Sequence, residues 1–315
     1  MAEYTRLTPD TLASLLSCYD LGTVTGMAPM AGGLANSSIK ITTGSGIYTL
    51  TVCDEKNEQE IDCLTRVSAY LVKNGIPTPK VIPARSGSAF IMHDSRPVYI
   101  KEFLPGQVRR DLSSAMLFQV GEVLADLHRL APPPDVPQEF PYGMNTFSQI
   151  FDLRLNHPYV DWLRQKIGFL QSALDPAMEK GLIHGDLFWD NLVFDDDILA
   201  AVLDFEEACH YYKLYDIGMC VIGCCARENR LSMARIASLV DGYQQRCPLT
   251  HTEKKQLKIF IEYAGAAASF WRFRQYHVRH PDPARQDSHS ELSCLADQVH
   301  DMDDREFFDR VFDPD

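Results

Sequence analysis

Two short segments place polar side chains at a spacing that strongly limits how the chain can fold. Residues 184–191 read H-G-D-L-F-W-D-N, and residues 203–206 read L-D-F-E after an apolar run. Residues 191–194 and 199–203 have the composition of two short strands, and an acidic turn joins them. This loop–strand–turn–strand order brings Asp186, Asn191 and Asp204 together on a rigid mount.

These residue types fit the transfer of a phosphoryl group from ATP. That reaction needs an aligned hydroxyl, an acceptor for its proton and positive charge around the phosphate oxygens. Asp186 is the candidate catalytic base, and Asn191 and Asp204 are candidate ligands for Mg²⁺. His184, a second candidate catalytic residue, can brace the loop by hydrogen bonding to its backbone. Glu206 can support a second metal ion or face solvent.

Charge and hydropathy disfavour several classes of partner. The 315 residues carry a formal net charge of -13, which repels nucleic acids and anionic membrane surfaces. The first ten residues contain no basic region followed by an apolar run, and the apolar stretch at 217–226 is too short to span a bilayer. The nine cysteines include no C-x-x-C pair, which favours reduced thiols in a cytoplasmic protein. Oligomeric state is not indicated.

The pattern of predicted secondary structure changes near residue 104, from mainly strands to mainly helices. Strand patterns at 46–52, 89–92 and 98–104 and a helical pattern at 58–73 come first. A helical period begins near Asp111, and after the proline-rich loop 131–141 the chain is mainly helical. We expect an α+β fold with two lobes. A small β-rich lobe at 1–104 would bind a nucleotide, and a larger, mainly helical lobe at 105–315 would bind substrate and carry out catalysis.

Three segments of the first lobe are candidates for nucleotide binding. The loop 31–37, A-G-G-L-A-N-S, can cover phosphates with its N–H groups or form an ordinary hairpin. No lysine occupies the expected strand position at 50–52. Lys56, just beyond it, can reach phosphates or remain a surface charge, and Glu60 of the following helix is its best partner. The main chain at 101–104 can meet an adenine edge or serve as a plain linker. The candidate residues are Gly32, Gly33, Asn36, Ser37, Lys56, Glu60, Glu102, Phe103 and Leu104.

The second lobe offers a candidate for substrate binding. Arg274 ends the aromatic-rich run S-F-W-R-F-R and can hold a substrate carboxylate. The alternative is a helix with an aromatic core face and surface arginines. Asp216, before an apolar helical run, can cap that helix or tie the catalytic loop. His277 and His280 lack supporting metal ligands, so we assign them to the surface.

The motifs together resemble the aminoglycoside phosphotransferase and choline kinase superfamily, whose members have a protein-kinase-like fold. Within it, the chain is most similar to bacterial type II homoserine kinases. Besides the catalytic loop, the resemblance rests on G-L-A-N-S at 33–37, Y-T-L-T-V at 48–52, G-I-P-T-P at 75–79 and L-A-D-L-H at 124–128. It extends from residue 4 to about 280.

The resemblance implies ATP with Mg²⁺, Asp186 as the base, Asn191 and Asp204 as metal ligands, and a displaced lysine at Lys56. It makes L-homoserine the leading small-molecule acceptor.

Two alternatives remain open. One is a kinase of choline, an amino sugar or an aminoglycoside, whose cationic acceptor would use Glu206, Glu207 and Trp271. The two glutamates replace aromatic residues expected in homoserine kinases. The other is a non-catalytic nucleotide-binding module, which the intact catalytic set argues against.

Overall fold

The computed structural model describes residues 7–30, 36–54 and 56–313. The chain divides into two compact units, Met1–Pro105 and Gly106–Asp315. The sequence-based boundary at 104 lies close to this division. The β-rich first unit and the mainly helical second unit match the expected α+β, kinase-like fold class.

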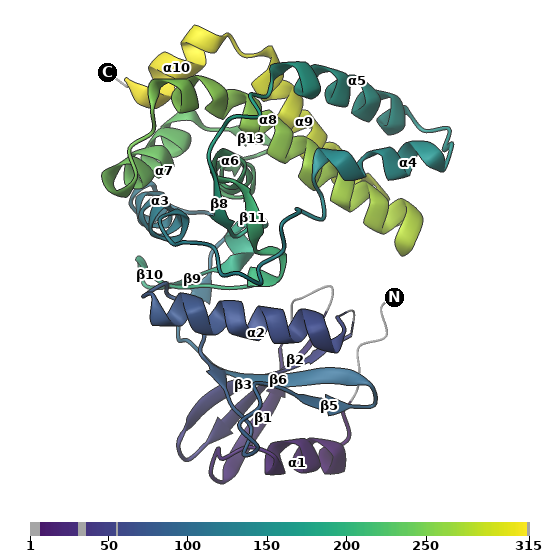
Figure 1. Cartoon of the computed structure of the whole chain (residues 1–315), viewed down its shortest axis with the longest axis vertical. Helices are drawn as coiled ribbons and strands as arrows, with labels where there is room; N and C mark the ends of the chain where they lie inside the picture. Colours follow the sequence, from purple (N-terminus) through teal and green to yellow (C-terminus); the bar gives the residue numbers. More distant parts are fainter. Residues whose placement is uncertain (1–6, 31–35, 55, 314–315) are drawn as a thin grey trace. The chain divides into compact units, whose positions relative to one another are not determined.

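The described residues of the N-terminal unit form one antiparallel sheet and two helices (Figure 1). The sheet order is β1–β2–β3–β6–β4, and β5 also pairs with β6. The helices are α1 (Pro9–Ser17) and α2 (Glu58–Lys73). The strands are β1 (Val24–Pro29), β2 (Asn36–Thr43), β3 (Gly46–Cys53), β4 (Val81–Ile82), β5 (Ile91–His93) and β6 (Arg96–Glu102). The predicted helix and three predicted strands are present, with shifts at the strand ends.

Apolar side chains from α1 and from the central strands form one core in this unit. Leu12 and Leu15 of α1 pack with Ile41, Leu50 and Ile100 of the sheet. These side chains are at most 5% exposed, so their burial supplies much of the driving force that holds the helix on the sheet.

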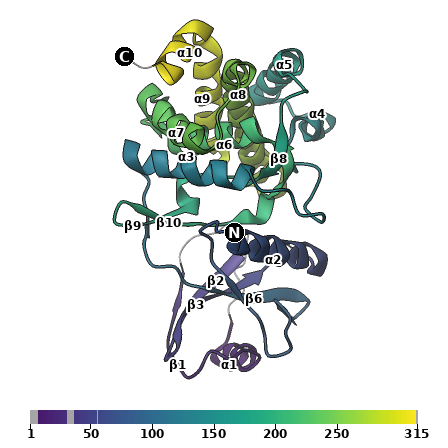
Figure 2. The same cartoon turned by 60° about the vertical axis from the view of Figure 1, so that its left-hand side comes forward.

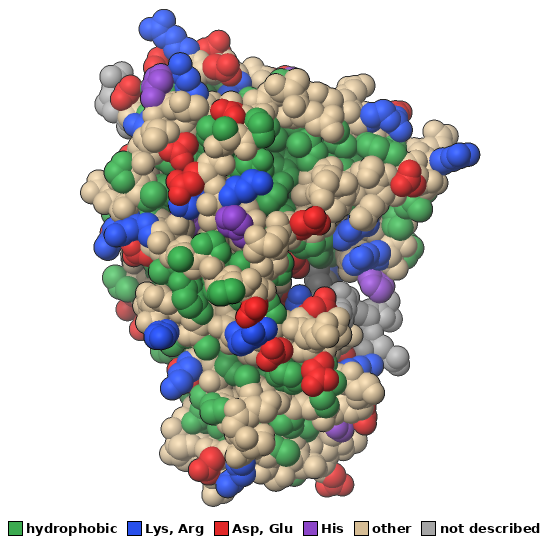
Figure 3. Space-filling model, in the orientation of Figure 1, with side chains coloured by type: hydrophobic (Ala, Val, Ile, Leu, Met, Phe, Trp, Pro, Cys, Tyr) green, Lys and Arg blue, Asp and Glu red, His purple; other side chains and the backbone are tan. Residues whose placement is uncertain are grey.

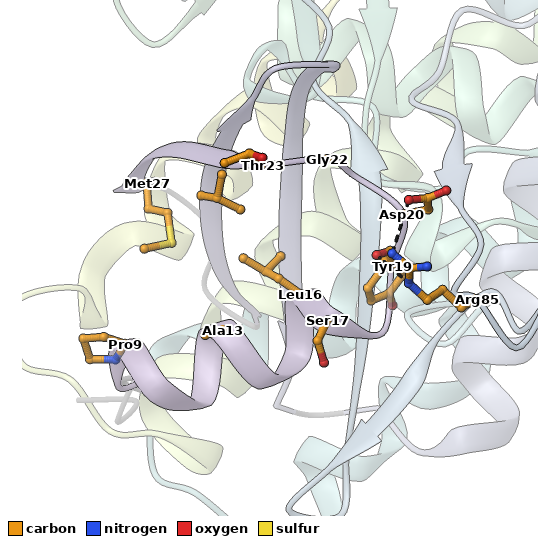
Figure 4. A pocket seen from close by; sticks show the side chains of 11 residues that line it. Pro9, Ala13, Leu16, Ser17, Tyr19, Asp20, Gly22, Thr23, Met27 and Arg85 are labelled. Atoms are coloured by element: carbon orange, nitrogen blue, oxygen red, sulfur yellow. Dashed lines mark hydrogen bonds and ion pairs between the residues drawn. The ribbon is translucent and has the colours of Figure 1, made fainter.

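A hollow of about 440 Å³ lies between α1 and β1 of the same unit (Figure 4). Leu16 and Met27 contribute apolar surface, and an ion pair of 3.2 Å joins Arg85 to Asp20 at its edge. None of the described nucleotide-binding candidates lines this hollow. It is therefore separate from those residues.

The C-terminal unit is mainly helical, with three small antiparallel sheets. Its sheets are β10–β9–β7, β11–β8 and β12–β13. The helices are α3 (Ser114–His128), α4 (Ser148–Asp152), α5 (Pro158–Ala173), α6 (Lys213–Cys224), α7 (Met233–Arg246), α8 (His251–Phe273), α9 (His289–Asp301) and α10 (Asp304–Phe312). The strands are β7 (Gln107–Val108), β8 (Lys180–Ile183), β9 (Leu192–Asp195), β10 (Ile198–Val202), β11 (Cys209–Tyr212), β12 (Ala226–Arg227) and β13 (Arg230–Leu231).

Within the described ranges, no helix combines the length and apolar character needed to cross a bilayer. On the face drawn in Figure 3, described acidic and basic side chains are interspersed.

Helices α3 and α7 lie side by side in both cartoon views and approach at two glycines (Figures 1 and 2). A Cβ atom on Gly121 would lie 2.0 Å from the carbonyl oxygen of Leu239, and one on Gly242 would lie 1.9 Å from that of Phe118. Because these neighbours are backbone atoms, a side chain at either position would push the helices apart.

A buried carboxylate connects α6 to α3 and to the segment after β8. Asp216 is 0% exposed and accepts hydrogen bonds from His184 N at 2.7 Å and Gly185 N at 2.8 Å. It also lies 3.0 Å from His128 Nε2, and the other ring nitrogen of His128 lies 2.9 Å from Tyr243 Oη of α7. Asp216 is inside α6, whose N-cap is Tyr212, so its role is to tie the loop and not to cap the helix.

We expect Gly242→Ala to lower the free energy of unfolding by about 1–3 kcal/mol, because the added methyl group overpacks the α3–α7 crossing. Gly168→Ala in α5 is the matched control, since a Cβ there meets no atom within 4 Å. Alanine should stabilise that helix by about 0.5–1 kcal/mol. Urea unfolding of both variants measures the difference, and equal effects would contradict the close approach.

We expect Asp216→Asn to lower the free energy of unfolding by about 3 kcal/mol. The amide group brings a donor to a position that already faces two backbone N–H donors, and it removes the buried negative charge beside His128. Asp241→Asn, on the exposed side of α7, should change stability by less than about 0.5 kcal/mol. Chemical denaturation tests this pair of variants, and a neutral Asp216→Asn would show that the carboxylate is dispensable.

Candidate active site

The loop that carries Asp186 leaves β8 through a glycine that no other residue can replace without strain. Gly185 has φ of 86°, and a Cβ there would lie 2.8 Å from the carbonyl oxygen of Glu207. Asp186 follows immediately. Phe188, farther along the loop, lies against Gly223 of α6, where a Cβ would meet the Phe188 Cα at 2.8 Å. The close contacts of Gly185 with Glu207 and of Gly223 with Phe188 thus fix the position of this loop.

His184 holds this loop in place through hydrogen bonds of its ring. Its ring is 0% exposed, Nδ1 accepts the N–H of Asp186 at 3.2 Å, and Nε2 lies 2.8 Å from the carbonyl oxygen of Leu203. Because Nδ1 is an acceptor, Nε2 carries the proton and donates it to Leu203. With both nitrogens engaged and no exposed surface, the His184 ring is placed to position the Asp186 backbone.

Hydrogen bonds also fix the two candidate metal ligands. The Asn191 side chain donates from Nδ2 to the main-chain carbonyl oxygen of Asp186 at 2.9 Å, and the main-chain carbonyl oxygen of Asn191 accepts the N–H of Leu203 at 2.8 Å. Asp204 follows Leu203 with φ of 61° and ψ of 66°, a left-handed conformation that is uncommon for residues other than glycine. Two hydrogen bonds of Asn191 therefore connect Asp186 to Leu203, the residue before Asp204.

The site is strongly negative. Although the Asp186 side chain keeps exposed surface, desolvation raises its pKa to about 8, and the charges of Asp204, Glu207 and Asp190 act in the same direction. Desolvation also raises the pKa of Asp190, with a further contribution from Asp204. Acidic side chains crowded in this way favour a bound cation.

The donor set fits a metal ion that arrives with a nucleotide. Within the described part of the chain, no three His, Cys, Asp or Glu side chains are arranged to hold a metal ion by themselves. Mg²⁺ characteristically takes one or two protein carboxylates and completes its shell with phosphate oxygens and water. Asn191 and Asp204 supply oxygen ligands of that kind.

A buried arginine lies in the same unit, at the end of α8. Arg274 is 8% exposed, and its Cζ atom lies 5.0 Å from the Tyr142 ring centroid and 5.3 Å from that of Phe270. Its Nη1 donates to Gln149 Oε1 at 3.2 Å. Burial lowers the pKa of Arg274, and the charge of Glu207 opposes that change. The surface interpretation is thus wrong for Arg274, whose guanidinium is buried.

Sequence reasoning did not identify Tyr142 or Gln149 as partners of Arg274. They follow the proline-rich loop and carry no local motif, so only the fold brings them to α8. The surface assignment holds for His280, whereas the ring of His277 lies 5.1 Å from that of His157 and 5.4 Å from that of His289.

The N-terminal candidates are described only in part. Gly32 and Gly33 lie outside the described residues, and Asn36 begins β2. Ser37 Oγ donates to Asp54 Oδ2 at 3.2 Å, and Lys56 is half-buried ahead of α2. The Glu60 carboxylate accepts the N–H of Asn57 at 2.8 Å in a capping box, which gives it a local structural role.

The expected adenine-binding segment already uses two of its main-chain donors. The N–H of Glu102 donates to Lys80 O at 2.9 Å, and that of Phe103 donates to Ile47 O at 3.0 Å. Leu104, half-buried, follows them. An adenine here would need the carbonyl oxygens of Glu102 and Phe103 or the backbone of Leu104.

Known proteins resemble both the sequence and the fold. The Phosphotransferase enzyme family matches residues 26–250. A homoserine kinase of Gluconobacter oxydans (strain 621H) is 28% identical over 286 residues, which cover 88% of this chain and 90% of the relative. A homoserine kinase of Xanthobacter autotrophicus (strain ATCC BAA-1158 / Py2) is 29% identical over 280 residues and 86% of each chain.

Two solved structures show the same fold. An amicoumacin kinase in complex with AMP-PNP and Ca²⁺ has a TM-score of 0.74 at 13% identity, covering 95% of this chain and 97% of the other. A microcompartment-associated aminopropanol kinase has a TM-score of 0.72 at 21% identity, covering 92% and 97%. With the family match spanning most of its length, the chain belongs to the phosphotransferase enzyme family and is an ATP-dependent kinase.

Proposed function

We propose that this kinase phosphorylates the side-chain hydroxyl of L-homoserine, with Mg²⁺ as the metal ion. The observation that carries the proposal is the buried guanidinium of Arg274 in the unit that holds Asp186. A buried cation is costly unless an anion compensates it, and a substrate carboxylate does so with bidentate geometry. Choline and aminoglycosides have no carboxylate, whereas homoserine has one, and the homoserine kinase relatives support this choice.

The residues divide the reaction among them. Asp186 accepts the proton as the homoserine oxygen forms a bond to the γ-phosphorus of ATP. The bond between that phosphorus and the oxygen bridging to the β-phosphate breaks, giving O-phosphohomoserine and ADP. Asn191 and Asp204 would hold Mg²⁺, which would neutralise charge on the phosphate oxygens. Because Asp204 is among the causes of the high Asp186 pKa, a cation there favours the ionised base.

In this proposal the N-terminal unit binds the nucleotide. The backbone of Gly32, Gly33, Asn36 and Ser37 and the side chain of Lys56 would meet the phosphates. The segment Glu102, Phe103 and Leu104 would meet the adenine, and Glu60 would support Lys56.

We expect Asp186→Asn to bind ATP nearly as well as the unchanged protein but to turn over about 10²–10⁴ times more slowly, because an amide cannot accept the hydroxyl proton. Calorimetry measures nucleotide binding, and a coupled assay of ADP formation measures turnover. Asp195→Asn, at the exposed end of β9, is the control and should keep full activity. Unchanged turnover in Asp186→Asn would remove the mechanism.

The acceptor is tested directly by measuring ADP formation with homoserine, choline, ethanolamine, methylthioribose and kanamycin. We expect kcat/KM to be highest for homoserine, because it alone in this panel presents a carboxylate to Arg274. Preference for choline or kanamycin would instead favour a cationic acceptor bound near Glu207. ATP binding without turnover of any of the five would favour a non-catalytic nucleotide-binding module.

A further inference from the structure

A second charged side chain lies beside the catalytic loop. Glu207 follows Asp204 closely, and its backbone lies so near Gly185 that a Cβ there would meet the Glu207 carbonyl oxygen at 2.8 Å. Its Oε1 accepts a hydrogen bond from Tyr142 Oη at 3.4 Å. The short segment after Asp204 thus places the backbone and Cβ of Glu207 next to the residue that precedes Asp186, and its carboxylate lies at Tyr142.

Tyr142 lies between this carboxylate and the buried arginine. Its hydroxyl faces Glu207, and its ring lies 5.0 Å from the Arg274 guanidinium carbon. The Trp271 ring approaches the same tyrosine edge-on, with centroids 6.3 Å apart. One aromatic side chain therefore contacts a negative group at one end and a positive group at its face.

This pair of opposite charges suits a ligand that carries both an ammonium and a carboxylate group. An α-amino acid bears the two on one carbon, so one ligand can neutralise both partners. The Glu207 backbone borders Gly185, the residue before Asp186, so a ligand at this carboxylate lies beside the loop that carries the candidate base.

We propose that Glu207, oriented by Tyr142, binds the α-ammonium group of the acceptor while Arg274 binds its carboxylate, so that the site selects zwitterionic amino acids. The inference rests on the proposed function and adds a specificity-determining residue to it. An amino alcohol satisfies only Glu207, and a hydroxy acid satisfies only Arg274. Each would leave one charged group without its ligand partner, and such a loss discriminates strongly between substrates.

The test compares L-homoserine with 4-hydroxybutanoate, which lacks only the amino group. For the unchanged protein we expect kcat/KM to favour homoserine by on the order of 10²-fold or more. In Glu207→Gln the preference should shrink at least about tenfold, mainly through a higher KM for homoserine, while 4-hydroxybutanoate is used no less well. A purely structural role would reduce activity on both compounds equally. Glu306→Gln, an exposed glutamate of α10, removes the same charge and should leave the preference unchanged.

Two further variants keep the outcome decisive. Tyr142→Phe keeps the ring and removes the hydroxyl bound to Glu207, so it should shrink the preference by a smaller factor even if Glu207→Gln folds poorly. Arg274→Gln should instead lower the preference for homoserine over 3-aminopropan-1-ol, which lacks the carboxylate.

The outcomes separate the two proposals. If the unchanged protein does not phosphorylate homoserine, the proposed function fails and the inference falls with it. If homoserine is phosphorylated but folded Glu207→Gln keeps the full preference for homoserine over 4-hydroxybutanoate, only the inference is overturned. If Glu207→Gln does not fold, the same result in Tyr142→Phe overturns it.

Discussion

The C-terminal unit depends on one buried carboxylate. Asp216 accepts two backbone N–H groups at the start of the catalytic loop and contacts His128, which in turn contacts Tyr243. Burial alone would raise the pKa of Asp216, but the hydrogen bonds that it accepts from the His128 side chain and from the His184 backbone outweigh this effect, so the pKa is lowered. The ionised group orients a loop that cannot form its own regular hydrogen bonds, and it connects that loop to three helices.

This arrangement explains why the grouping of the candidate catalytic residues could be predicted from sequence. Asp186, Asn191 and Asp204 are near one another in the chain, and the bonds that join them run through Leu203 and His184 over short separations. Local spacing therefore fixes much of their geometry. The bracing role of His184 was predictable for the same reason. The capping box at Glu60 was missed, although Asn57 precedes Glu60 at the usual interval.

The acceptor side could not be predicted in the same way. Arg274 meets Tyr142 and Gln149 across more than a hundred residues, and neither partner belongs to a periodic pattern. The two interpretations of Arg274, surface charge or ligand, differ only in burial, which depends on how α8 packs. The α3–α7 crossing could not be predicted from sequence either. Gly121 and Gly242 are required there because the two helix backbones approach closely, which only the folded structure shows.

The charges around Tyr142 also bear on the charge of the acceptor, which the net charge of the chain does not determine. A formal charge of -13 tolerates a cationic acceptor and does not require one. In the proposed function the carboxylates crowded near Asp186 have two tasks: Asp204 would hold the metal ion, and Glu207, which accepts a hydrogen bond from the Tyr142 hydroxyl, would meet the acceptor. Removing a guanidinium from water against Tyr142 and Phe270 costs more than cation–π contact returns. An acidic site that nevertheless buries Arg274 is better matched to an acceptor with both charges than to a purely cationic one.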